Sequence, residues 1–134
     1  SIEEPGMPSK TFVRSRARAF QEQGGRCYYC DSAMWRDRVD DPTAFAARHQ
    51  IPRAKVREFV CTGEHLIARQ DGGDDSPANI VAACWHCNRK RHHHRPSKAP
   101  APAAYKRRVQ QLIAKGRWLS ALLMRASTPI SSLS

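Results

Sequence analysis

Residues 61–90 decide the fold, and they read CTGEHLIARQDGGDDSPANIVAACWHCNRK. The apolar and β-branched residues of 59–67 predict a strand, and those of 80–83 predict a second, shorter strand. Between them, 71–77 is dense in Asp, Gly, Ser and Pro, a composition typical of turns. A helix is expected over 86–93. The segment therefore predicts a strand, a turn-rich loop, a strand and a helix.

Two cysteine pairs bracket this unit, Cys27-Tyr28-Tyr29-Cys30 and Cys84-Trp85-His86-Cys87. In a reducing compartment, paired C-x-x-C turns favour a metal over disulfides. Two such turns supply the four thiolates of a tetrahedral Zn²⁺ site, which would tie together distant parts of the chain. Thioredoxin-like redox chemistry would need only one pair, in a βαβ context that is not evident here. The fifth cysteine, Cys61, has no partner pair and is expected to be a small apolar residue of the strand.

The flanking segments predict helices. Ser9 as N-cap and Gly24-Gly25 as terminator delimit a helix over 9–23, and Asp41-Pro42 begins another that ends near Arg48. A short helix is expected over 52–58.

Chain organisation follows from these elements. We expect one α+β domain over 9–95, preceded by a disordered tail or expression remnant at 1–8. A Pro/Ala-rich linker is predicted over 96–104, a C-terminal helix over 105–126 and a disordered tail over 127–134.

The charge of the chain is strongly positive. It contains 23 Lys and Arg against 12 Asp and Glu, a formal net charge of +11. Basic side chains spread along a chain indicate a polyanion partner such as DNA, and a basic surface without that role is the alternative. No membrane segment or export signal is evident, so we expect a cytoplasmic protein without a membrane partner. The oligomeric state stays open, with a monomer favoured.

The central unit resembles the HNH endonuclease family, particularly small stand-alone bacterial HNH nucleases. The matching text is Glu64-His65-Leu66-Ile67, Gly72-Gly73, Asn79-Ile80-Val81 and Cys84-x-x-Cys87-Asn88-Arg89-Lys90, within residues 24–95. The resemblance implies a small ββα-metal (HNH, or His-Me finger) core, here with a four-cysteine zinc site and flanking helices. It also implies DNA cleavage that leaves 5′-phosphate and 3′-hydroxyl ends. Ala68 departs from the proline that the family often has at that position.

The chemistry of the residues agrees with this resemblance. His65 can serve as the general base, because a neutral imidazole accepts a proton near pH 7. Glu64 and Asn88 offer hard oxygen ligands to a catalytic Mg²⁺. Adjacent residues on a strand point to opposite faces, so Glu64 and His65 share a site only if the strand ends or bulges there, and Gly63 offers that freedom. Asn79 matches the loop-fixing Asn of the family.

His92 lies four residues after Asn88, on the same helix face. Some relatives in this family place a metal-binding His there, and with His92 the site would suit Mn²⁺ or Ni²⁺ as well as Mg²⁺. The residues expected to hold DNA phosphates are Arg89, Lys90, Arg91, Lys106, Arg107 and Arg108.

The favoured function is a metal-dependent DNA endonuclease that nicks with low sequence specificity. A non-catalytic, zinc-stapled DNA-binding module is the main alternative, but it has no need for Glu64, His65 and Asn88 together. A protein-interaction adaptor would leave the positive charge unexplained.

Overall fold

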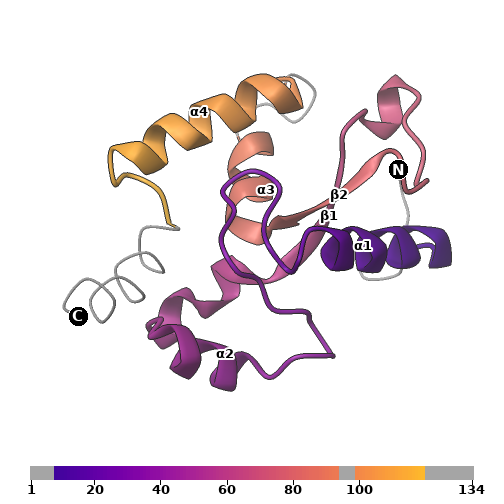
Figure 1. Cartoon of the computed structure of the whole chain (residues 1–134). Helices are drawn as coiled ribbons and strands as arrows, with labels where there is room; N and C mark the ends of the chain where they lie inside the picture. Colours follow the sequence, from indigo (N-terminus) through magenta and orange to yellow (C-terminus); the bar gives the residue numbers. More distant parts are fainter. Residues whose placement is uncertain (1–7, 94–98, 120–134) are drawn as a thin grey trace.

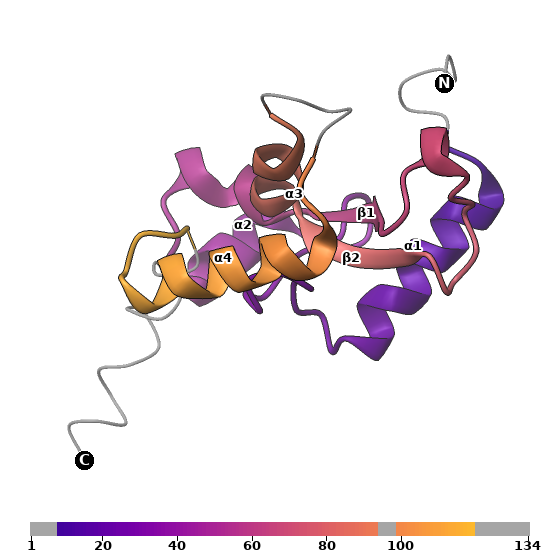
Figure 2. The ribbon, with the colours of Figure 1, turned by 90° about the horizontal axis from the view of Figure 1, so that it is seen from above.

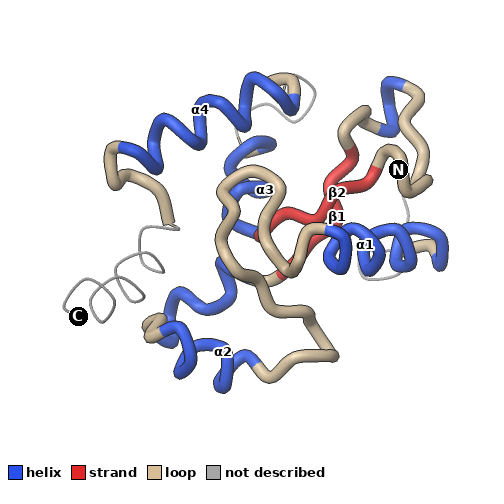
Figure 3. Tube along the Cα trace, viewed as in Figure 1, coloured by secondary structure: helices blue, strands red, loops and turns tan. Residues whose placement is uncertain are grey.

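The computed structural model describes residues 8–93 and 99–119. A short two-stranded sheet lies at the centre of the described chain, with helices and long loops around it (Figure 3). The elements in chain order are α1 (Lys10–Glu22), α2 (Pro42–His49), the 3₁₀ helix η1 (Arg53–Phe59), β1 (Cys61–His65), the 3₁₀ turn η2 (Arg69–Asp71), β2 (Ile80–Cys84), α3 (Trp85–His92) and α4 (Pro102–Ala114).

The hairpin is antiparallel and regular. Its register runs from Cys61 opposite Cys84 to His65 opposite Ile80, with no bulge between them. Helix α3 begins directly after β2, which completes the predicted strand, loop, strand and helix. The small α+β fold of the ββα-metal type, with clustered cysteines, is therefore confirmed.

Helices α1 and α3 pack on opposite faces of the hairpin (Figures 1 and 2). The alternation of β1 explains this arrangement. Gly63 and His65 meet Phe12 of α1, whereas Thr62 and Glu64 face α3. The hairpin thus presents consecutive side chains to two different helices.

The predicted caps of the first two helices are confirmed. The hydroxyl oxygen of Ser9 accepts a hydrogen bond from the amide of Phe12, and the carboxylate of Asp41 accepts one from Thr43. Gly24 has a positive φ of 65° just beyond α1, a conformation that glycine adopts without strain.

The last helix differs from the prediction. It begins at Pro102, inside the segment expected to be a linker, and ends at Ala114 rather than near 126. Gly116 adopts a φ of 67°, and the amide of Arg117 bonds back to the carbonyl of Leu112, so a glycine-terminated turn closes the helix. The two predicted tails lie largely or wholly outside the described residues, as do positions 94–98 of the linker.

Two apolar clusters support the hairpin. The larger one surrounds the four paired cysteines and includes Tyr29, Tyr105 and Val109, all buried. The smaller one packs Phe59 of η1 against Trp35 and Ile51. Cysteine side chains therefore make up much of the main core.

Candidate active site and metal centre

The four paired cysteines form one buried cluster. Their Sγ atoms all lie within 4.8 Å of one another, and the Sγ atoms of Cys30 and Cys84 are 3.9 Å apart. A Zn–S bond of about 2.3 Å implies S–S edges of about 3.8 Å in a regular tetrahedron. The cysteines are thus positioned to form a metal site, and their geometry and thiol chemistry are compatible with zinc.

Backbone amides point at the sulfur atoms of this cluster. The amides of Tyr29 and Cys84 each donate to the Sγ of Cys27 at 3.3 Å. Burial opposes ionisation of Cys27, but hydrogen bonds from the other cysteines outweigh it and hold its pKa well below the ordinary value. Sharing hydrogen bonds with Cys27 raises the pKa values of Cys84 and Cys87. A bound cation would stabilise the thiolate forms of the four cysteines.

Helix α4 and the turn after it cover this cluster. The hydroxyl of Tyr105 donates to the carbonyl of Cys87 at 2.7 Å, and the indole Nε1 of Trp118 donates to the Sγ of Cys87 at 3.2 Å. The amide group of Gln110 donates to the carbonyl of Tyr29 in the first cysteine turn. The C-terminal helix is thus attached to both cysteine turns.

Cys61 lies outside the cluster, as expected. It is buried on β1, and burial raises the pKa of its thiol to about 12. A neutral thiol in this position behaves as a small apolar side chain.

Glu64 is a buried carboxylate with partners on both oxygens. Its Oε2 accepts from the guanidinium of Arg91 at 2.8 Å and from the hydroxyl of Tyr29 at 3.1 Å, while its Oε1 lies 3.2 Å from Nε2 of His92. Burial opposes ionisation, but hydrogen bonds from His92 and Arg91 outweigh it and lower the pKa of Glu64. Glu64 is therefore charged at neutral pH, and Arg91 and Tyr29 fix the orientation of its carboxylate.

His65 ends β1 on the opposite face of the strand. Its ring stacks on Phe12, with centroids 5.5 Å apart and planes at 21°. Its Nε2 lies 2.8 Å from Oδ1 of Asp75 in the turn-rich loop. A Cβ on Gly63 would lie 2.5 Å from the ring of Phe12, so glycine is needed there for close packing. Of the two alternatives, a bulge or the end of the strand, the structure shows the second, because β1 pairs with β2 without a bulge and ends at His65.

Asn79 fastens the loop between the strands. Its Oδ1 accepts from the amide of Ile67 at 2.8 Å, and its Nδ2 donates to the carbonyls of Ile67 and Asp74. These three bonds hold the two ends of the loop together. Asn79 thus occupies the position that the loop-fixing role requires.

Asn88 and His92 extend from the same face of α3 towards β1. The Nδ2 of Asn88 donates to Oγ1 of Thr62 at 3.0 Å, and among the described residues no hydrogen bond is made to its Oδ1. A cavity of about 690 Å³ lies beside them, and Glu64, His65, Asn88 and His92 all line it. The structure therefore brings together the predicted base and all three predicted ligands of the catalytic cation.

The predicted phosphate-binding residues differ in their exposure and contacts. Lys90, Arg107 and Arg108 are exposed, in keeping with the prediction. Lys106 lies over the ring of Tyr28, with 4.3 Å between its Nζ and the ring centroid. The prediction for Arg91 differs from the structure, because Arg91 is buried and pairs with Glu64.

Arg89 is only partly available to a phosphate. Its guanidinium donates to Oε1 of Glu58 at 2.9 Å and lies over the ring of Trp85 at 4.4 Å. The same carboxylate oxygen is 2.7 Å from Nδ1 of His86, so Glu58 joins η1 to α3.

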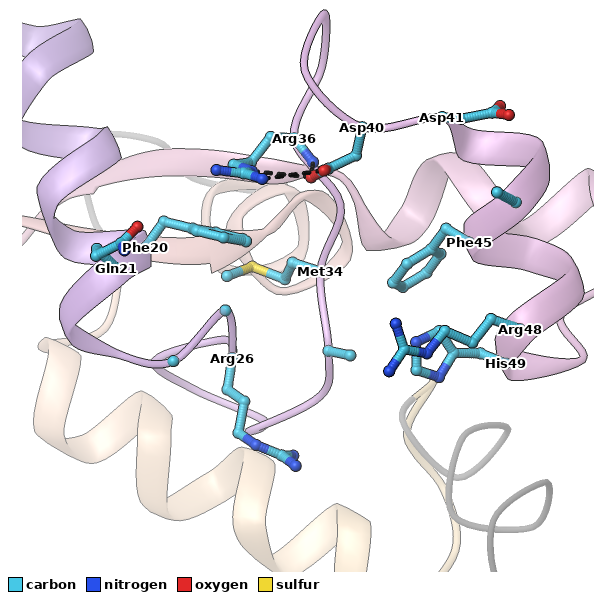
Figure 4. A pocket seen from close by; sticks show the side chains of 14 residues that line it. Phe20, Gln21, Arg26, Met34, Arg36, Asp40, Asp41, Phe45, Arg48 and His49 are labelled. Carbon is cyan, nitrogen blue, oxygen red and sulfur yellow. Dashed lines mark hydrogen bonds and ion pairs between the residues drawn. The ribbon is translucent and has the colours of Figure 1, made fainter.

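A second cavity, of about 740 Å³, shares no lining residue with the first. Figure 4 shows Phe20 and Met34 on one side of it, and Phe45, Arg48 and His49 of α2 on another. Burial and the nearby charges of Arg48 and Arg26 lower the pKa of His49. Side chains of both charges line this cavity, among them Arg48, Asp40 and Asp41, and no site was predicted there.

Sequence reasoning missed three residues of the first site. The sequence predicts an ordinary turn residue at Asp75 and a phosphate contact at Arg91, and it indicates no role for Tyr29. A signal existed for Arg91, because it lies four residues after Cys87 and so shares the inward face of α3. Nothing local to Asp75 or Tyr29 reveals a contact with a residue so far along the chain.

Comparisons with known proteins give one match. The model of the HNH endonuclease family matches residues 54–94. Searches of curated proteins and of solved structures returned no match. Within the described part of the chain, no helix has the length and apolar character that crossing a membrane requires. The matched segment contains β1, the Asn79 loop, β2 and α3, so this part of the chain is similar to the HNH endonuclease family.

Proposed function

We propose that this protein is a metal-dependent DNA endonuclease that hydrolyses phosphodiester bonds at the cavity beside Glu64 and His65. The observation that carries the proposal is the convergence of a base, a carboxylate, a carboxamide and a second imidazole on one cavity, within the segment that matches the HNH family. A non-catalytic DNA-binding module has no use for this combination.

The residues present fit a catalytic divalent cation. Glu64 Oε1 and His92 Nε2 are 3.2 Å apart, a separation that suits two ligands of one ion with bonds of about 2.1 Å. The Oδ1 of Asn88 is the third donor. An oxygen, amide and imidazole set accommodates Mg²⁺, Mn²⁺ or Ni²⁺. When bound, the cation would stabilise negative charge on the phosphoryl and leaving oxygens.

His65 performs the proton transfer in this proposal. Its imidazole accepts a proton from a water molecule whose oxygen attacks the phosphorus atom. The bond between phosphorus and the 3′-oxygen breaks, and that oxygen takes a proton from solvent. Arg91 and Tyr29 hold the carboxylate of Glu64 in place, and Asn79 keeps the loop after His65 closed.

DNA is the proposed partner because its phosphates match the positive charge of the chain. Lys90, Lys106, Arg107 and Arg108 are the proposed phosphate contacts. The four-cysteine cluster is proposed to hold structural Zn²⁺, which joins the first cysteine turn to the hairpin and α3.

The test is cleavage of supercoiled plasmid by the zinc-loaded full chain with added Mg²⁺, Mn²⁺ or Ni²⁺, or with none. Nicked circles should appear only with an added cation. His65→Ala should slow cleavage by about 10²- to 10⁴-fold, the usual contribution of a general base, without weakening DNA binding. His49→Ala is the matched control, since His49 lines the other cavity. A protein that binds the plasmid tightly but cleaves it with none of these cations would instead be the DNA-binding module.

A further inference from the structure

We infer that Asp75 is a positioning residue for His65, one that holds the proton on Nε2 of the imidazole and leaves Nδ1 as the atom that accepts a proton from water. This inference rests on the proposed role of His65 as the base. It adds the tautomer of the base and the residue that sets it.

The contact itself determines the tautomer. Oδ1 of Asp75 lies 2.8 Å from Nε2 of His65, and both side chains are less than one-fifth exposed. A carboxylate can only accept a hydrogen bond, so Nε2 must carry the hydrogen. In a neutral imidazole the free lone pair is then on Nδ1. Among the residues that the structure describes, Nδ1 has no hydrogen-bond partner.

A second contact fixes the plane of the ring. Phe12 stacks on His65 from α1, and Phe12 is itself seated against Gly63, where any larger residue would collide with it. Stacking restricts the tilt of the imidazole, and the bond to Asp75 restricts its rotation within that plane. Together the two contacts leave one orientation for Nδ1.

Asp75 is in turn held by several groups. Its carboxylate accepts hydrogen bonds from Arg69 at 3.2 Å and from the hydroxyl of Ser9 at 2.9 Å, and its carbonyl accepts one from Ser15. The hydrogen bond from His65 is the main reason that the pKa of Asp75 lies below its ordinary value. The acceptor is therefore charged at neutral pH and anchored to α1.

The neighbouring Asp74 provides a matched control. Its Oδ1 accepts from the amide and hydroxyl of Ser76, two residues away, which is an ordinary turn-capping arrangement. Either aspartate could have a purely local role in the turn. Of the two, only Asp75 forms a described hydrogen bond with His65.

The first experiment reads the tautomer directly. Two-bond ¹⁵N–¹H NMR spectra of the imidazoles in the zinc-loaded full chain, recorded without catalytic cation, should show His65 as the Nε2–H tautomer. Asp75→Ala should give a mixture with the Nδ1–H form, and Asp74→Ala should leave the spectrum of His65 unchanged. A wild-type His65 in the Nδ1–H form would overturn the inference, whether or not the protein cleaves DNA.

The second experiment measures cleavage. Asp75→Ala should lower kcat by about 10- to 100-fold, the range typical of residues that orient a functional group, with little change in KM. Asp75→Asn keeps an acceptor oxygen and should recover most of this loss. If Asp75→Ala does not fold, Asp75→Asn still tests the inference. A His65 that changes to the Nδ1–H tautomer in this variant without any loss of kcat would contradict it. A wild type with the Nε2–H tautomer but no nuclease activity would refute the proposed function and leave the contact intact.

Discussion

Removal of Arg91 tests the buried ion pair at the centre of the site. The side chains of Arg91 and Glu64 are only 6% and 4% exposed, and their charged atoms are 2.8 Å apart. Two unit charges about 4 Å apart attract by about 4 kcal/mol at an effective dielectric constant of about 20. Loss of one partner from a buried pair commonly costs about 3–5 kcal/mol, because the other charge stays desolvated. Tyr29 and His92 still contact Glu64, so we expect Arg91→Met to lower the free energy of unfolding by about 3 kcal/mol, near the lower limit.

Urea denaturation of the zinc-loaded protein at pH 7 measures this loss, which is a large part of a typical total stability of about 5–15 kcal/mol. Glu64→Gln combined with Arg91→Met removes the stranded charge and should recover at least half of the loss. Arg107→Met, on the exposed face of α4, serves as the control and should stay close to wild type. A single Arg91→Met variant within about 1 kcal/mol of wild type would refute the reasoning, as would a double variant no more stable than the single.

Four further outcomes are expected. Elemental analysis should find one zinc per chain. Cys30→Ser should abolish zinc binding and unfold the domain, whereas Cys61→Ala should keep the zinc and lower the free energy of unfolding by only about 1 kcal/mol. Urea denaturation should show that Asn79→Ala lowers the free energy of unfolding by about 2–3 kcal/mol, because three hydrogen bonds are lost at about 1 kcal/mol each. Burial opposes ionisation of Glu58, yet hydrogen bonds from His86 and Arg89 lower its pKa. The contribution of Glu58 to stability is therefore complete above its unfolded pKa of 4.5 and is lost as the pH falls through its lower folded pKa. Glu58→Gln should remove this part of the pH dependence when the free energy of unfolding is measured across an acid titration. DNA affinity should fall with salt by about one log–log unit per phosphate neutralised, and a smaller slope is expected when alanines replace the exposed basic residues of α4, Arg107 and Arg108.

Local sequence features predicted much of the fold. The turn-rich loop, the strands beside it and the cysteine turns depend on residues close together in the chain, and all of them form. The first strand is shorter than the predicted 59–67, since η1 ends at Phe59 and β1 spans Cys61–His65. The caps Ser9 and Asp41 also act on amides two or three residues away. Where a structural cause is local, the residue types and their spacing are sufficient.

Contacts between distant segments were harder to predict. The bond between Asp75 and His65 forms only after the loop has closed, and the composition of that loop indicates no more than a turn. The extent of α4 was overestimated because its apolar pattern continues beyond Gly116, although a glycine is a common helix terminator. At Gly63, conformational freedom suggests a bulge or a strand end, but the constraint on this residue is the ring of Phe12, which belongs to a distant helix.

The register of the hairpin also bears on how the protein would sort metals. Cys84 lies opposite Cys61 at one end of the ladder, and Glu64, the proposed ligand of the catalytic cation, lies three residue steps from Cys61 along β1. At about 3.3 Å per step, the backbone sets a spacing of about 10 Å between Cys61 and Glu64. This spacing is several times a Zn–S bond of about 2.3 Å. If both proposed metals bind, the hairpin would act as a spacer between a soft and a hard metal centre.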